Sequence, residues 1–193
     1  MINPENFFLD IQQAAVDILD ADAYFDGVPI LTEQLGDLDN AINLMMGKLG
    51  LCVIIESPFA TVTSKDTAAT FFGNIPIVVT VWEDTVLNRF NEDINIKHHT
   101  GAALIALWLL THSRPMKDGE QIANVFVAEE PTMVNLASTV DRTQFPNIQG
   151  TQLRLSCSAG FVYPPQQTLL SENNTALLSE MGVRLTTDRP FTK

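Results

Sequence analysis

The sequence predicts an α+β fold, in which helices pack on one face of a small mixed or antiparallel sheet and an extended C-terminal tail follows. Three observations predict it: an amphipathic helical pattern near the N-terminus, apolar strand patterns in the middle and later parts of the chain, and a wholly apolar helix between them. The order helix, helix, strand, strand, helix, strand, strand is typical of an α+β layer.

The first helix is predicted from about Pro4 to Asp20. Asn3 is a good N-cap, Pro4 suits the first helical position, and apolar residues then recur at helical spacing. A short extended piece at 28–31 follows the break at 20–27.

A second, shorter helix is predicted from Asp37 or Asp39 to Leu49, and Gly50 ends it. The next segment, Leu51–Ile55, is apolar at every position and rich in β-branched residues, which is typical of a buried strand.

Residues 75–82 are predicted to form a central strand. Its odd-numbered apolar residues share one face, Val78 and Trp82 share the other, and Pro76 stands at its start, where it removes no interior ladder bond. The preceding segment, 58–73, is expected to be a long excursion or protruding hairpin, and it carries the pair Phe71 and Phe72. We interpret it as a candidate contact arm.

The helix from Ala102 to about Ser113 contains nine consecutive apolar residues, 102–110. A helix on one face of a sheet in a small domain needs only one apolar stripe. The opposite side of this helix is therefore expected to meet either the first helix or a neighbouring subunit.

Two later strands are predicted, at 122–128 and Thr151–Cys157. In the second, the residues from Leu153 to Cys157 alternate between a buried and a wet face, with Cys157 pointing inward. Residues 129–150 are expected to form a loop or wide hairpin. We predict a single domain over 1–163 and a C-terminal extension over 164–193 that lies on a neighbouring surface.

The composition limits the classes of protein to which this chain could belong. The 193 residues carry 11 Lys and Arg against 23 Asp and Glu, a formal net charge of −12. Such a chain repels phosphate and anionic lipid, which disfavours nucleic-acid readers and membrane-surface helices. The apolar run 102–110 is far shorter than a bilayer span, and the N-terminus lacks the basic region of an export signal, so we expect a soluble, intracellularly made chain.

Charged residues make up only 18% of the chain, against about 25% in ordinary soluble domains. A subunit that buries part of its surface against copies of itself needs fewer charges. The composition therefore favours an oligomer.

Several motifs that carry chemistry are missing or incomplete. Neither a phosphate-binding loop around Gly47 nor a calcium loop beginning at Asp20 has the required residues. The adjacent His98 and His99 point away from each other, so we expect a solvated helix start rather than a metal site. The segment around Cys157 lacks a nucleophile elbow, and both cysteines are predicted to be free, buried thiols. We predict no cofactor, no metal and no enzymatic activity.

Acidic residues end two of the predicted strands: Glu56, Glu83 and Asp84. We interpret them as ordinary strand-end residues, although a hydrolase or nuclease would need them to converge with a histidine. Asn88 and Arg89 follow Glu83. Either Glu83 and Arg89 close the turn as an ion pair, or Arg89 reaches a neighbour's carboxylate across a subunit boundary.

Three segments together resemble small structural proteins of tailed bacteriophages, namely tail terminator or tail completion proteins: the strand 51–56, the passage 75–89 and the helix 100–113. The resemblance implies an α+β subunit of a hexameric ring that caps the tail tube and contacts tail tube and neck or head-completion proteins. DNA would pass through its lumen without specific binding, and the protein would reside in the virion tail or neck.

Alternatives stay open at this point: another neck or head–tail connector protein, a small hydrolase or nuclease, or a monomeric binding or inhibitor protein. For the ring subunit, six residues are predicted to lie at the subunit interface: Glu83, Asn88, Arg89, Phe71, Phe72 and Trp108.

Overall fold

The structure is a computed structural model of the whole chain. It describes residues 4–32, 50–58, 60, 64–65, 69–90, 98–136, 147–162, 167–168 and 186–187. The predicted helix ending at Leu49 and most of the predicted extension 164–193 lie outside these residues.

The described residues form two main helices, α1 (Phe7–Asp20) and α4 (His99–His112), and the short α3 (Leu87–Phe90). The 3-10 turns η1 (Pro4–Asn6) and η2 (Ala23–Phe25) flank α1. The strands are β1 (Ile30–Thr32), β2 (Leu51–Ile55), β3 (Ser64–Lys65), β4 (Ala69–Asp84), β5 (Met116–Lys117), β6 (Glu120–Gln121), β7 (Val127–Asn135), β8 (Ile148–Val162), β9 (Gln167–Thr168) and β10 (Thr186–Thr187).

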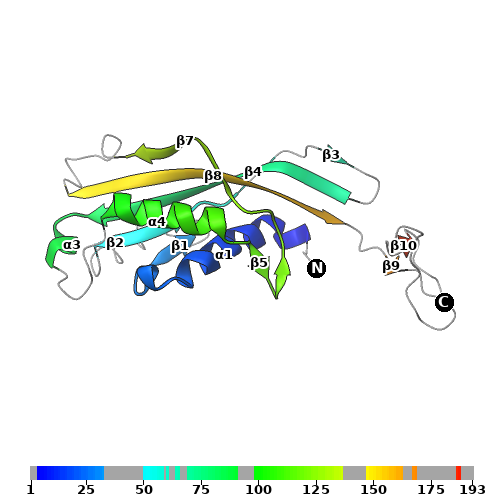
Figure 1. Cartoon of the computed structure of the whole chain (residues 1–193), viewed down its shortest axis with the longest axis horizontal. Helices are drawn as coiled ribbons and strands as arrows, with labels where there is room; N and C mark the ends of the chain where they lie inside the picture. Colours follow the sequence, from blue (N-terminus) through cyan, green and yellow to red (C-terminus); the bar gives the residue numbers. More distant parts are fainter. Residues whose placement is uncertain are drawn as a thin grey trace.

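The main sheet has the strand order β1-β2-β4-β8-β7, and β3 pairs with β4. β1 runs parallel to β2, whereas the other pairs in this sheet are antiparallel. The two longest strands, β4 and β8, pair along nearly their whole length at its centre (Figure 1). The predicted α+β class with a mixed sheet is confirmed. Two small hairpin-like pairs, β5-β6 and β9-β10, lie apart from the main sheet.

One face of the sheet, called the front face here, forms the core. Its central residues are the odd-numbered apolar residues of β4 from Ile75 to Val81 and Leu153 and Leu155 of β8, all at most 1% exposed. The buried sides of α1 and α4 join them in one hydrophobic cluster, and Figure 1 shows both helices along the same side of the sheet. The helices therefore cover the front face together.

A bulge in β4 changes the roles of its first residues. Phe72 pairs with Ala159 and Ile75 with Cys157, so three steps on β4 match two on β8. Phe72 and Ile75 consequently both face the core, and Phe72 stacks on Phe7 at 5.3 Å between ring centroids. The segment expected to be a protruding arm thus contributes Phe72 to the core.

Pro76 lies inside β4 rather than at its start, because the strand begins at Ala69. Val78 O accepts a hydrogen bond from Glu56 N, so the backbone of Val78 faces β2. By strand alternation the Pro76 nitrogen faces the same side, beyond the last β2 pair at Ile55. The proline thus removes no ladder bond, although its predicted position was wrong.

The strand expected at 122–128 lies further along the chain. Residues 122–126 are not in a strand, and β7 takes in Glu129–Asn135, which were expected to be loop. Met133 and Val134 pair with Leu153 and Gln152 of β8. Met133 and Val134 therefore belong to a strand, because they pair with the long strand β8.

Candidate functional site

The outer face of α4 is the largest apolar feature of this layer that stays open. The inward side of the helix is buried, including Ala103, Ala106 and Leu110 at 0% exposure. On the opposite side, Leu104 is 54%, Ile105 37% and Trp108 59% exposed. These three residues share one side of the helix because Leu104 and Ile105 stand four and three positions before Trp108. We call Leu104, Ile105 and Trp108 the α4 stripe.

The indole at the centre of this surface is held in place locally. The His112 ring stacks on Trp108, with centroids 4.9 Å apart and planes 18° apart. His112 Nδ1 lies 2.8 Å from Trp108 O, one helical turn back. Because the ring partner fixes the side chain, Trp108 presents a preorganised apolar surface, which lowers the entropy lost on docking.

Glu83 positions α4 from the end of β4. Its side chain is 1% exposed, Oε2 accepts from His99 N at 2.8 Å, and Oε1 accepts from Asn88 Nδ2 at 3.0 Å. His98 Nδ1 lies 3.3 Å from the same Oε1. A carboxylate at a helix N-terminus satisfies free N–H groups and complements the helix dipole. Glu83 therefore anchors the first turn of α4 to the sheet.

His99 completes this anchor, and the prediction of a solvated histidine pair was wrong for it. Its ring is buried, with Nδ1 2.8 Å from Thr151 Oγ1 and Nε2 3.2 Å from Gln149 Oε1. The amide oxygen of Gln149 only accepts, so Nε2 donates to it, and in the neutral ring Nδ1 accepts from the Thr151 hydroxyl. His98, by contrast, is exposed as expected.

The acids that a hydrolase would need do not gather at one point. Glu83 lies opposite Leu51 and Glu56 follows the far end of β2, so they are roughly 16 Å apart along the strand at ~3.3 Å per residue. Asp84 Oδ1 accepts from the backbone N–H groups of Val86 and Leu87 at 2.9 and 3.1 Å. Glu83 and Asp84 thus bind different backbone groups, and Glu56 stands beyond the other end of β2.

The six residues predicted for a subunit interface fall into three groups. Glu83 and Asn88 bond to each other inside the chain, and Asn88 is 3% exposed. Phe72 is in the core, whereas Phe71 and Trp108 are exposed, at 43% and 59%. Arg89 belongs to α3, but its side chain lies outside the described part, so its ion pair remains a prediction.

Sequence reasoning identified Trp108 but assigned no role to Leu104 or Ile105. The unbroken apolar run 102–110 was the signal that could have found them. Residues three or four positions apart share a side of a helix. Once one buried residue is known, the inward alanines can therefore be told apart from the outward large side chains.

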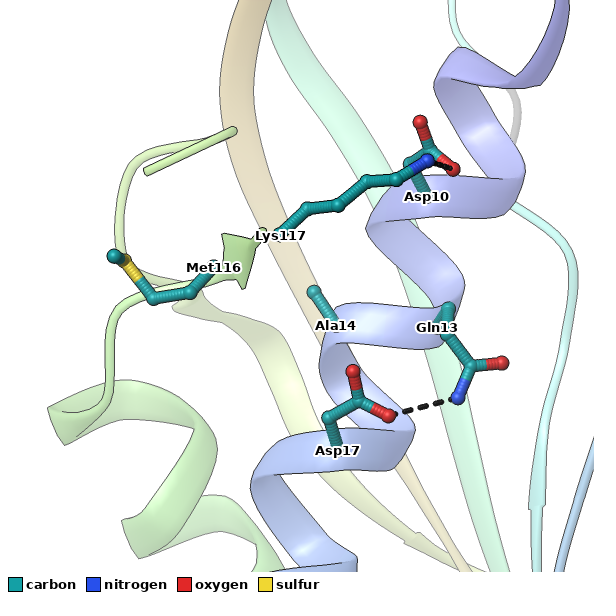
Figure 2. A pocket seen from close by; sticks show the side chains of 6 residues that line it. All are labelled: Asp10, Gln13, Ala14, Asp17, Met116 and Lys117. Atoms are coloured by element: carbon teal, nitrogen blue, oxygen red, sulfur yellow. Dashed lines mark hydrogen bonds and ion pairs between the residues drawn. The ribbon is translucent and has the colours of Figure 1, made fainter. Parts of the chain in front are cut away.

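A small pocket of about 120 Å³ separates α1 from the β5-β6 hairpin (Figure 2). Lys117 Nζ contacts Asp10 Oδ1 at 2.5 Å across it, and Gln13 Nε2 donates to Asp17 Oδ1. Asp10 Oδ2 is buried and has no hydrogen-bond partner among the described residues. The ion pair ties the hairpin to α1.

Both cysteines are buried and free, as predicted. Burial raises the pKa of Cys52 and of Cys157 to about 12. Because the thiolate is the reactive form, these side chains are protonated at neutral pH and act as small apolar residues.

Within the described ranges, no three His, Cys, Asp or Glu side chains gather where they could hold a metal ion. Among those same residues, no helix has the length and hydropathy to cross a membrane.

Comparison with other proteins gives no assignment. No protein-family model matches the sequence, and the search of curated proteins finds no match.

Proposed function

We propose that this protein is a structural virion subunit, which assembles into a ring that caps a phage tail tube and joins it to the neck or head. The observation that carries the proposal is the α4 stripe, because three large apolar residues of this apolar helix are exposed to solvent. Fully burying an aliphatic side chain of this size contributes roughly 1.5–3 kcal/mol. Contact with another subunit would recover the exposed part of that contribution.

The charge of the chain suits such a ring. A net charge of −12 per chain keeps an assembled particle soluble. An acidic lumen would also let a DNA duplex pass without binding the wall, because like charges repel. The tail tube and a neck or head-completion protein would contact the two ends of the ring, and the mature protein would reside in the virion.

The first experiment is multi-angle light scattering of the purified chain over a wide concentration range. We expect a hexamer of the 21.3 kDa chain, and we expect Trp108→Gln to dissociate it. Leu9→Gln is the matched control, because Leu9 is a 38% exposed apolar residue on the other helix, α1. The control should assemble as the unaltered chain does.

A second measurement covers assembly that occurs only on a tail. Immunogold labelling of virions containing this chain should place the label at one end of the tail. A chain that is monomeric at every concentration and unlabelled in the virion would refute the proposal. Label inside the neck, away from the tail tube, would favour the connector alternative.

A further inference from the structure

The sheet has a second face, which α1 and α4 do not cover. Strand alternation points Val78 and Trp82 of β4 and Arg154 of β8 away from the core, and Val127, paired with Ser156, points the same way. Phe71, opposite Gly160, joins them. Val127 is 63% and Phe71 43% exposed, Arg154 is exposed, and Val78 and Trp82 are half-buried. We call these five residues the back face.

Two aromatic rings lie low on this face because glycines stand opposite them. A Cβ at Gly150 would come within 2.6 Å of the Trp82 ring, and a Cβ at Gly160 within 3.2 Å of the Phe71 ring. Both glycines sit in a strand without a side chain of their own, which is typical of places where another group approaches closely. The back face is open toward β8 and β7 but not at β2, because Cys52, Ile54 and Thr80, which also point away from α1 and α4, are only 0%, 5% and 4% exposed.

The edges of the sheet are poorly suited to strand addition, which leaves the faces as contact surfaces. β7, one edge strand, contains Glu129, Glu130 and Pro131, and its register with β8 shifts in this stretch. Charges, proline and irregular pairing on an edge strand oppose pairing with another chain. β1, the other edge strand, is only three residues long.

Charge complementarity selects which surface meets the back face. Arg154 brings a cation to the back face of a chain with net charge −12. On the helical side, α1 lies beside α4 and exposes Asp17 and Asp20. A guanidinium can pair with carboxylates and can also stack on an indole such as that of Trp108. The acidic, apolar helical layer of one copy thus complements the back face of another.

We propose that the α4 stripe of one copy packs against the back face of the next copy, with Arg154 directed at the helical layer. This inference rests on the proposed function and names its subunit contact. The two surfaces lie on opposite sides of the same sheet, so each copy uses one of them toward each neighbour. Such a head-to-tail contact produces a ring when the rotation closes.

A mixing experiment with two defective variants tests the contact. Trp108→Glu disables the α4 stripe and keeps the back face, whereas the double variant Val127→Glu/Arg154→Glu disables the back face and keeps the stripe. All three positions are exposed, so folding should be retained, and far-ultraviolet circular dichroism and thermal unfolding check this. Each variant alone should run as a 21.3 kDa monomer. Their equimolar mixture should form a heterodimer of twice that mass, because one intact stripe meets one intact back face.

Three other outcomes would each contradict the inference, and they can be told apart. A mixture that stays monomeric, while the unaltered chain forms rings, removes this contact but leaves the ring subunit standing. A back-face double variant that still assembles shows that the stripe docks elsewhere. An unaltered chain that is monomeric at every concentration overturns both this inference and solution assembly. Val86→Glu is the control, because Val86 is a 41% exposed apolar residue in the turn after β4 and lies on neither surface, and it should keep the unaltered mass.

Discussion

The helices α1 and α4 have the same length and cover the same sheet face, but they meet solvent differently. α1 buries Phe7, Ile11 and Leu19 and exposes Gln13 and Asp17, so its polar side suits water. α4 buries three alanines, two leucines and His99 and leaves Leu104, Ile105 and Trp108 exposed. Two helices can therefore share one core while only one of them, α4, exposes a cluster of large apolar residues.

The two helices are also fixed to the sheet differently. Gln12 Nε2 of α1 donates to Ile55 O, a neutral hydrogen bond at 2.7 Å. α4 is held by the buried carboxylate of Glu83 and by the ring of His99. The helix with the unsatisfied outer face therefore has the stronger anchor, which would keep that face in a fixed orientation for a partner.

The largest expected effect separates the two sides of α4 itself. Leu110→Ala, at a position with no exposure, should cost about 2–5 kcal/mol of unfolding free energy, because it leaves a cavity. Leu104→Ala on the stripe should change it by less than about 0.5 kcal/mol in the monomer. Urea denaturation at dilution measures both, and equal losses would show that the stripe is packed within the chain.

Much of this contrast can be predicted from sequence, because local patterns carry it. The alternation in 75–82 and 151–157 identified the middle of β4 and β8, although both strands are longer, and the apolar run 102–110 identified a helix with exposed apolar residues. The end of α1 at Asp20 also follows from local signals, whereas the predicted start at Pro4 is the 3-10 turn η1 and the α-helix itself begins at Phe7.

What could not be predicted depends on distant partners. Thr151, which binds the His99 ring, is 52 positions away in the chain, and no local pattern announces it. Glu129, Glu130 and Pro131 have low strand preference, so only pairing with β8 makes β7 a strand. Likewise, Phe72 faces the core only because the bulge adds one residue to β4.

The anchors provide the next test. Glu83→Gln should lower the unfolding free energy by about 2–3 kcal/mol, because an amide cannot accept charge-assisted hydrogen bonds at both of its ends. Gln12→Leu should cost about 1 kcal/mol for each neutral hydrogen bond lost. Thermal unfolding compares the totals, and hydrogen exchange should show faster opening of α4 only in the first variant. Similar exchange in both variants would mean that Glu83 does not anchor α4.

A smaller loss of stability is expected from ionisation of Cys157, whose thiol belongs to the core beneath α1 and α4. Burial raises the pKa of Cys157 from 9.0 to about 12, so between these values the unfolded chain binds fewer protons and stability falls as pH rises. From pH 8 to pH 10 this thiol should cost about 1.4 kcal/mol. Urea denaturation at the two pH values measures the loss. Cys157→Ala should shift stability at every pH but show a shallower decline, and an unchanged decline would mean that Cys157 is not the source.

Replacing one outer residue of each helix by a residue typical of the other helix should have the smallest effect on the unfolding free energy and a clear effect on the oligomer. Leu104→Gln makes α4 resemble α1, and Gln13→Leu makes α1 resemble α4. Both side chains are exposed, so each unfolding free energy should move by less than about 0.5 kcal/mol. Only Leu104→Gln should weaken the oligomer in sedimentation velocity, since Gln13→Leu removes nothing from the α4 stripe and keeps the carboxylates of Asp17 and Asp20. If Gln13→Leu changed the oligomer as much, apolar area alone would govern assembly, and α4 would have no special place in it.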